Sequence, residues 1–180
     1  FWNYYFKINR HLHSNTISEL IMNIFITGIA GFLGSNLADF YIKKNFSVFG
    51  CDNLVGGDLV NVSPKANFVK ADCEDLGKMK ELTKNIDVVI HAAAYAHEGL
   101  SVVSPNIICS NIVNASTSIF SAAIQNKVKR IVFCSSMARY GNIDQPFRED
   151  DVPNPVDPYG ISKLAAEKIL INLCNTYGVE

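Results

Sequence analysis

Tyr159 and Lys163 have the side-chain types and the spacing of a proton-transfer pair. They stand four residues apart at the start of a segment with helical periodicity, so their side chains lie on the same face. A phenol with a pKa near 10 is a poor base at neutral pH, but an adjacent ammonium favours its phenolate. Because Tyr-x-x-x-Lys pairs are common in ordinary helices, this interpretation depends on the elements around them.

A glycine-rich stretch, Thr27-Gly28-Ile29-Ala30-Gly31-Phe32-Leu33-Gly34, joins a strand-like run to a helical segment. Glycines there let the backbone turn tightly and approach a pyrophosphate, while the helix N-terminus offers free N–H groups. Asp52 ends the next strand, 18 residues after Gly34. A carboxylate there can bind an adenosine ribose and repel a 2′-phosphate. The stretch predicts a dinucleotide site that prefers NAD to NADP; the alternative is a helix-start turn with close helix–strand packing.

Alternating strand-like and helical segments must position these residues. Strand patterns occupy 23–27, 46–51, 67–71, 86–92 and 130–135, and helical patterns occupy 32–44, 75–85, 106–126 and 159–177. Such alternation forms right-handed βαβ units, so we predict an α/β fold with a doubly wound parallel sheet in the order 3-2-1-4-5. Residues 1–21 lack periodicity and are expected to be an unstructured extension or translated upstream sequence.

The spacing Gly-x-x-Gly-x-x-Gly resembles that of the extended short-chain dehydrogenase/reductase family, whose other landmarks follow in order. These are Asp52-Asn53-Leu54, Asp72, His91-Ala92-Ala93-Ala94, Asn111, Ser135-Ser136, Tyr140-Gly141 and Tyr159-Gly160-Ile161-Ser162-Lys163. Within that family the chain resembles NAD-dependent sugar-nucleotide epimerases and dehydratases, above all UDP-glucose/UDP-galactose 4-epimerases. The resemblance covers residues 22–180 and implies a Rossmann-like NAD-binding domain, truncated before the C-terminal substrate-binding part.

The resemblance also implies which residues bind NAD. They are Gly28, Gly31, Phe32, Leu33, Gly34, Asp52, Asn53, Asp72, Cys73, Ala92, Ala93, Ala94, Asn111, Tyr159 and Lys163. Asp72 and Cys73 would meet the adenine end, and the three alanines would line the dinucleotide path.

Ser136, Tyr159 and Lys163 are the expected catalytic residues. Tyr159 would move a proton, Lys163 would reach the nicotinamide ribose, and Ser136 would hydrogen-bond the same substrate oxygen as Tyr159. Ser135 competes with Ser136 for that role. In the resembled epimerases the working serine lies four residues before the tyrosine of the following Tyr-Gly, and counting back from Tyr140 selects Ser136.

The three residues after Ser136, Met137-Ala138-Arg139, help to distinguish between the reactions that the family catalyses. Sugar-nucleotide dehydratases usually carry an Asp-Glu pair there and decarboxylases a glutamate, so the resemblance favours a 4-epimerase, which needs only reversible hydride transfer at C4 and one proton shuttle. A nucleotide-sugar dehydratase or reductase, or a non-catalytic dinucleotide-binding redox sensor, remains as an alternative. Ala138 departs from the threonine frequent in UDP-galactose 4-epimerases, which leaves the sugar open.

Composition narrows the partners and the compartment. The 180 residues are 48% hydrophobic, which excludes intrinsic disorder, and their net charge of −1 offers no field for nucleic acid or anionic lipid. No uninterrupted apolar run reaches the roughly 18 residues of a membrane span. The five cysteines fit neither a zinc site nor a disulfide framework. We therefore expect a cytoplasmic, metal-free protein that binds neither nucleic acid nor membranes. The family resemblance implies in addition that the full-length protein is a homodimer and acts on a nucleotide-diphosphate sugar.

Overall fold

Five parallel strands form the centre of the computed structural model, which describes residues 22–142 and 146–180. The strands are β1 (Asn23–Thr27), β2 (Ser47–Asp52), β3 (Asn67–Lys70), β4 (Val88–His91) and β5 (Arg130–Phe133). Their order in the sheet is β3-β2-β1-β4-β5, with every neighbouring pair parallel, which confirms the predicted topology. The extension predicted over residues 1–21 lies outside the described residues.

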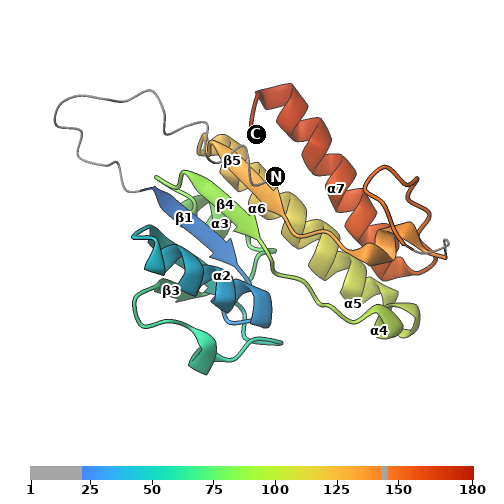
Figure 1. Cartoon of the computed structure of the whole chain (residues 1–180), viewed down its shortest axis with the longest axis horizontal. Helices are drawn as coiled ribbons and strands as arrows, with labels where there is room; N and C mark the ends of the chain where they lie inside the picture. The colour runs from blue at the N-terminus through green and yellow to red at the C-terminus, as the bar shows by residue number, and fades with distance from the viewer. Residues whose placement is uncertain (1–21, 143–145) are drawn as a thin grey trace.

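Helices connect the strands on both faces of the sheet (Figure 1). They are α2 (Phe32–Lys43), α3 (Leu76–Leu82), α4 (Glu98–Val103), α5 (Pro105–Cys109), α6 (Ala115–Gln125) and α7 (Pro158–Tyr177). Their bounds agree with the sequence patterns to within a few residues, with two exceptions. The helix predicted over 106–126 is divided into α5 and α6 by a π-helical turn at Ser110–Asn114, and α4 had no predicted counterpart.

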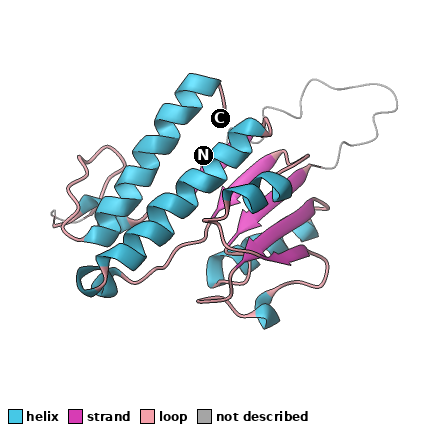
Figure 2. Ribbon diagram, turned by 180° about the vertical axis from the view of Figure 1, so that it is seen from behind, coloured by secondary structure: helices cyan, strands magenta, loops and turns pink. Residues whose placement is uncertain are grey.

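Alternate side chains of the central strands face two separate cores. Phe25 and Val89 point to the face that is covered by α3, α6 and α7. Ile24, Ile26 and Ile90 point to the opposite face, which α2 covers. Because a parallel sheet is buried on both faces, its strands read as continuous apolar runs, as these do. The long helices α6 and α7 lie side by side in both views (Figures 1 and 2).

The helical segment Pro105–Gln125 is long and apolar enough to cross a membrane by length and composition. In this fold it is a core helix. Ile112, Ile119 and Phe120 are buried against the sheet or α7, and almost half of the segment's most apolar window is buried inside the domain. Such helices in soluble proteins satisfy the same test, so the segment is not a sign of a membrane span.

His91 is the centre of a series of buried hydrogen bonds that crosses from β1 to α6. Its Nδ1 lies 2.6 Å from Thr27 Oγ1 and its Nε2 lies 3.0 Å from Ser116 Oγ, and the Ala93 N–H donates to the same threonine oxygen. The ring is 1% exposed, and burial lowers its pKa to about 3, with the positive charge of Lys163 adding to the effect. His91 is therefore neutral, and it ties β1 and β4 to α6.

This buried imidazole predicts an acid-sensitive fold. Below pH 6.5 an unfolded histidine binds a proton that folded His91 rejects until about pH 3, so stability falls as the pH falls through this window. The expected slope is about 1.4 kcal/mol per pH unit for one proton. Urea unfolding between pH 6.5 and 5 measures it. His91→Gln should be less stable at pH 7 but lack this slope, whereas His97→Gln at an exposed position should keep it.

Candidate functional site

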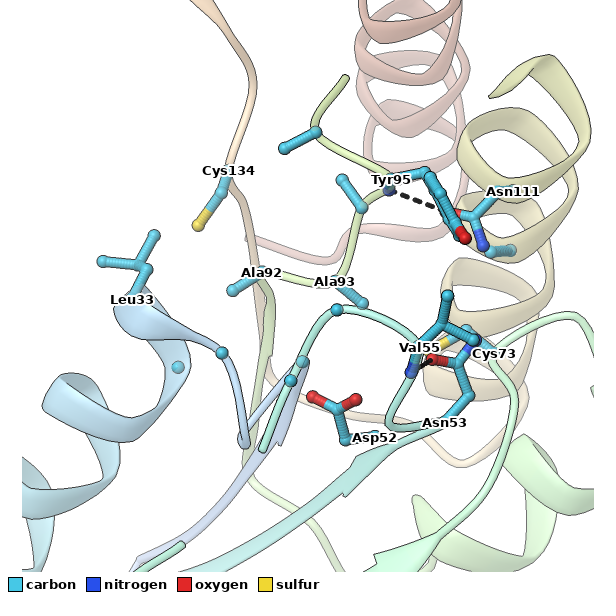
Figure 3. A pocket seen from close by; sticks show the side chains of 18 of the residues that line it. Leu33, Asp52, Asn53, Val55, Cys73, Ala92, Ala93, Tyr95, Asn111 and Cys134 are labelled. Carbon is cyan, nitrogen blue, oxygen red and sulfur yellow. Dashed lines mark hydrogen bonds between the residues drawn. The ribbon is translucent and has the colours of Figure 1, made fainter. Parts of the chain in front are cut away.

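The carboxyl ends of β1, β2 and β4 open into a cavity of about 490 Å³. Its walls come from the turn after β1, the loop after β2, the segment after β4, and the start of α7 (Figure 3). This is where ligands bind in doubly wound sheets, and the volume lies in the range of cofactor sites, about 300–1,000 Å³.

The turn between β1 and α2 forms the floor of this cavity. Gly28 has a φ of 70°, and a Cβ on it would lie 2.8 Å from the Ala93 backbone. A Cβ on Gly34 would overlap the carbonyl oxygen of Gly28. Gly31 caps α2 without a side-chain hydrogen bond, which leaves N–H groups at the helix start for a ligand. The glycines thus let helix, strand and ligand approach closely.

Asp52 lies at the carboxyl end of β2 and is 8% exposed (Figure 3). Its Oδ2 accepts a 3.1 Å hydrogen bond from Ala30 N and its Oδ1 a 2.8 Å bond from Leu54 N. These two backbone donors orient the carboxylate at the edge of the cavity. Each carboxylate oxygen retains acceptor capacity, so the group can still receive hydrogen bonds from a ribose.

Asn53, Asp72 and Cys73 form the far end of the cavity. Asn53 donates to Asp72 Oδ2 over 3.1 Å and accepts from Val55 N, so the loop after β2 is joined to the end of β3. The Cys73 thiol lies 4.0 Å from the buried Cys51 thiol. This end combines an apolar floor with polar edges, as an adenine site requires.

The segment after β4 is held by a side chain of the π-helical turn. Asn111 Oδ1 accepts a 2.8 Å hydrogen bond from Tyr95 N, the contact drawn in Figure 3. Ala92, Ala93 and Ala94 line the cavity directly before this contact, and their small side chains keep the path open. π-Helical turns are frequent at functional sites, and here the turn aims Asn111 at the loop.

Tyr159 and Lys163 lie in the first turns of α7, whose start is capped by Asp157 through the Gly160 N–H. Both line the cavity, and Lys163 is 3% exposed. The Lys163 ammonium donates to Cys134 O over 2.9 Å and lies 4.9 Å from the centre of the Phe133 ring. Burial lowers the pKa of Lys163 to about 8, so at neutral pH the charge is retained inside the domain.

The protonation of Tyr159 differs from the sequence-based expectation. Burial raises the pKa of the phenol, Ser136 lowers it by a hydrogen bond, and the charges of Glu98 and Asp157 raise it. We expected the ammonium of Lys163 to favour the phenolate, but that ammonium is turned to the Cys134 carbonyl. In this structure Tyr159 is therefore a neutral phenol, and the correction follows from burial and two nearby carboxylates.

The two competing serines have different partners. Hydrogen bonding to Ser136 is the one contribution that lowers the pKa of the Tyr159 phenol, and the Ser136 Oγ accepts from Ala138 N over 3.2 Å. Ser135 donates to Glu167 Oε2 over 2.9 Å. Ser135 lines the cavity although its hydroxyl donates to Glu167. Ser136 does not line this cavity, so of the three predicted catalytic residues the cavity brings together only Tyr159 and Lys163.

The cavity brings together every residue expected to bind the cofactor. The lining also contains residues outside the predicted cofactor-binding set, which are Val55, Gly56, Gly57, Ala71, Tyr95, Ala96, His97, Ala115, Cys134 and Ser135, the last of which the sequence had offered only as a catalytic alternative to Ser136. Three of them, Ala71, Tyr95 and Ser135, directly flank a predicted residue, so adjacency was a signal for these alone. Cys134 contributes a backbone carbonyl, which no side-chain pattern can reveal. In the described part of the chain, no group of three or more metal-binding side chains is found.

Known proteins resemble this chain in sequence and in structure. UDP-glucose 4-epimerase of Lactobacillus helveticus is 36% identical over 152 residues, which are 83% of this chain and 46% of that protein. UDP-glucose 4-epimerase of Thermotoga maritima, solved with UDP-glucose, superposes with a TM-score of 0.84 at 32% identity and covers 88% of this chain and 53% of its own. UDP-glucose 4-epimerase of Brucella ovis, solved with NAD, superposes with a TM-score of 0.84 at 32% identity. The superposition covers 88% of this chain and 50% of the Brucella chain.

This chain therefore spans about half the length of the relatives it matches. Residues 24–180 match the sequence profile described as the NAD dependent epimerase/dehydratase family. The match runs from β1 to the end of the chain and includes the glycine turn, Asp52 and the Tyr159–Lys163 pair. The chain belongs to the NAD-dependent epimerase/dehydratase family, as its resemblance in sequence had implied.

Proposed function

We propose that the whole protein is an NAD-dependent nucleotide-sugar 4-epimerase, with a UDP-sugar as its substrate. One observation carries this proposal: a single cavity joins the glycine turn and Asp52 at one end to Tyr159 and Lys163 at the other. A dinucleotide laid along that cavity would bring its redox-active ring to the proton-transfer pair. The relatives named above as UDP-glucose 4-epimerases support the substrate class.

The residues present fit NAD. Gly28 and Gly34 let the turn pack closely against the segment after β4 and against α2, because a Cβ at either would clash with backbone atoms. The start of α2 would then present its N–H groups to the pyrophosphate. Asp52 would bind the adenosine ribose, and Asn53, Asp72 and Cys73 would surround the adenine. Tyr159 and Lys163 would hold the nicotinamide ribose. Bound NAD would supply the acceptor, and then the donor, of the hydride at the sugar C4.

The residues of this chain supply the proton chemistry. The positive charge of bound NAD would favour the phenolate form of Tyr159. As a phenolate, Tyr159 would take the proton of the sugar 4-OH as the hydride leaves C4, and return it after the 4-keto sugar has turned over. Ser136 already bonds the phenol, so it would stabilise charge as it develops on the oxygen. Lys163 keeps a positive charge near the reaction, since its ammonium is protonated below a pKa of about 8.

The side chains around Ser136 favour epimerisation over elimination. Met137 is exposed, Ala138 is small, and Arg139 forms an ion pair with Glu167. None of the three can act as the carboxylate acid or base that dehydration needs. Intact Tyr159 and Lys163 inside the cavity argue against a pure redox sensor, which would need only the dinucleotide half of the site.

The broader properties of the whole protein belong to the same proposal. We propose residues 22–180 as its NAD-binding domain and 1–21 as an extension, a homodimer as its assembly, and the cytoplasm as its location. Five free cysteines in the described residues agree with a reducing compartment.

Epimerase activity is tested directly with the whole protein and UDP-glucose or UDP-galactose. Each sugar nucleotide should be converted into the other, with transient absorbance of reduced nicotinamide and no net consumption of added NAD. Loss of water from the sugar would support a dehydratase, and cofactor binding without turnover would support the sensor.

Asp52 is expected to determine the choice of cofactor. Its buried carboxylate faces the ribose position and would repel the 2′-phosphate of NADP. Asp52→Ala should narrow the ratio of NAD to NADP affinity about tenfold, which corresponds to about 1.4 kcal/mol. Calorimetric titration with each cofactor measures the ratio, and Asp58→Ala in the same loop is the control. Equal affinity of the unmodified protein for both cofactors would contradict the assignment.

A further inference from the structure

Glu167 lies two turns after Tyr159 on α7 and uses both of its carboxylate oxygens. Oε2 accepts the 2.9 Å hydrogen bond from Ser135, and Oε1 lies 3.1 Å from Nη1 of Arg139. The Arg139 and Glu167 side chains are 21% and 19% exposed, so their ion pair is largely shielded from water. A charge-assisted contact in such a place is stronger than an ordinary surface pair.

These two contacts enclose Ser136. Ser135 precedes it directly, and Arg139 follows it by three residues, in the 3₁₀ turn Met137–Tyr140. Arg139 is also held from its other side, where its guanidinium lies 4.9 Å from the centre of the Tyr140 ring. A single carboxylate on a long helix therefore fixes the chain both before and after the serine.

Three consecutive turns of α7 hold this segment. Lys163 donates to Cys134 O, and Glu167 binds the side chains of Ser135 and Arg139. Tyr159, one turn before Lys163, is close enough to Ser136 for that hydroxyl to lower the pKa of the phenol. Residues spaced by four lie on the same face of a helix, so α7 meets the segment along one line. Glu167 thus joins the chain on both sides of Ser136 to α7.

We propose that Glu167 is a positioning residue that holds the Ser136 hydroxyl against the Tyr159 phenol by clamping Ser135 and Arg139. The inference rests on the proposed function of Ser136 and Tyr159, and it adds a residue that touches neither cofactor nor sugar. Its carboxylate contacts Ser135 and Arg139, and the proposal assigns its effect on catalysis to the position of Ser136 between them.

A double-mutant cycle in the whole protein tests this path. Glu167→Ala should lower kcat about tenfold to a hundredfold, as displacement of a catalytic group does, while KM and bound NAD change little. In a Ser136→Ala background the same substitution should lower kcat no further. Glu167→Gln keeps an acceptor for Ser135 but loses the charge that pairs with Arg139. Its kcat should lie between those of the unmodified protein and Glu167→Ala. Glu81→Gln, at the exposed pair with Lys78, is the control and should leave kcat unchanged.

A readout independent of turnover is the ¹³C resonance of the Tyr159 ring carbon that bears the hydroxyl, in the full chain at neutral pH. Ser136→Ala and Glu167→Ala should shift this resonance by the same amount. The double variant should show no shift beyond that of either single variant. If Glu167→Ala fails to fold, Glu167→Gln and Ser135→Ala give the same comparison.

An unmoved resonance in the Glu167 variants, or a kcat loss that adds fully to that of Ser136→Ala, would overturn the proposal. Absent epimerase activity in the unmodified protein would instead refute the proposed function, and the resonance would still decide whether the clamp exists.

Discussion

Tyr159→Phe should lower kcat of the whole protein by at least about a hundredfold while NAD stays bound, since general acid–base groups contribute 10²–10⁴-fold. The substitution removes the hydroxyl that Ser136 bonds but keeps a ring that is 8% exposed and packs with Ile108 and Ile112. Stability should therefore change little. The measurement is steady-state epimerisation of UDP-galactose, with bound NAD determined after release from the protein.

Tyr177→Phe is the matched control, because that tyrosine is exposed at the last residue of α7. Ser136→Ala should lower kcat less than Tyr159→Phe, since it removes a hydrogen-bonding partner and leaves the proton-transferring group. A Tyr159→Phe protein with unchanged kcat would refute the mechanism.

Lys163→Met should abolish most of the activity and weaken NAD binding as well. Loss of a hydrogen bond to a charged group corresponds to about 1.5–3 kcal/mol, or an increase of about tenfold or more in the Kd for NAD. The exposed Lys168 on the same helix provides the control, Lys168→Met. Retained NAD affinity in Lys163→Met would show that the ammonium does not reach the cofactor.

The same substitution should change how stability depends on pH in the absence of cofactor. Folded Lys163 loses its proton near pH 8, whereas an unfolded lysine keeps it to about pH 10.4. Between these values unfolding takes up a proton, so this residue makes stability rise with pH. Below pH 8 its burial is fully unfavourable. The stability of Lys163→Met relative to the unmodified chain should therefore decrease as the pH rises from 8 to 10, which urea unfolding at each pH would reveal.

The sequence was sufficient to predict the sheet and the placement of the glycine turn and Asp52 at one cavity. Strands buried on both faces read as apolar runs such as Val88–His91, and their alternation with helices limits the topology to few arrangements. The glycine turn and Asp52 follow strand ends directly, so their positions at the carboxyl edge could be derived from local patterns. Residues 1–21 gave no such pattern, and the expectation for them stays a prediction.

What the tertiary structure decided is the environment of each proposed catalytic group. The pairing of Tyr159 with Lys163 was readable from their spacing, but the rise in the phenol's pKa depends on burial and on Glu98, 61 residues away in the chain. The choice of partners by Ser135 and Ser136 depends on Glu167, which only the docking of α7 on β5 and the following turn brings to Ser135. Local periodicity determines which face of a helix is apolar. The protonation states of buried side chains depend instead on contacts between residues distant in the sequence, and only the folded chain contains those contacts.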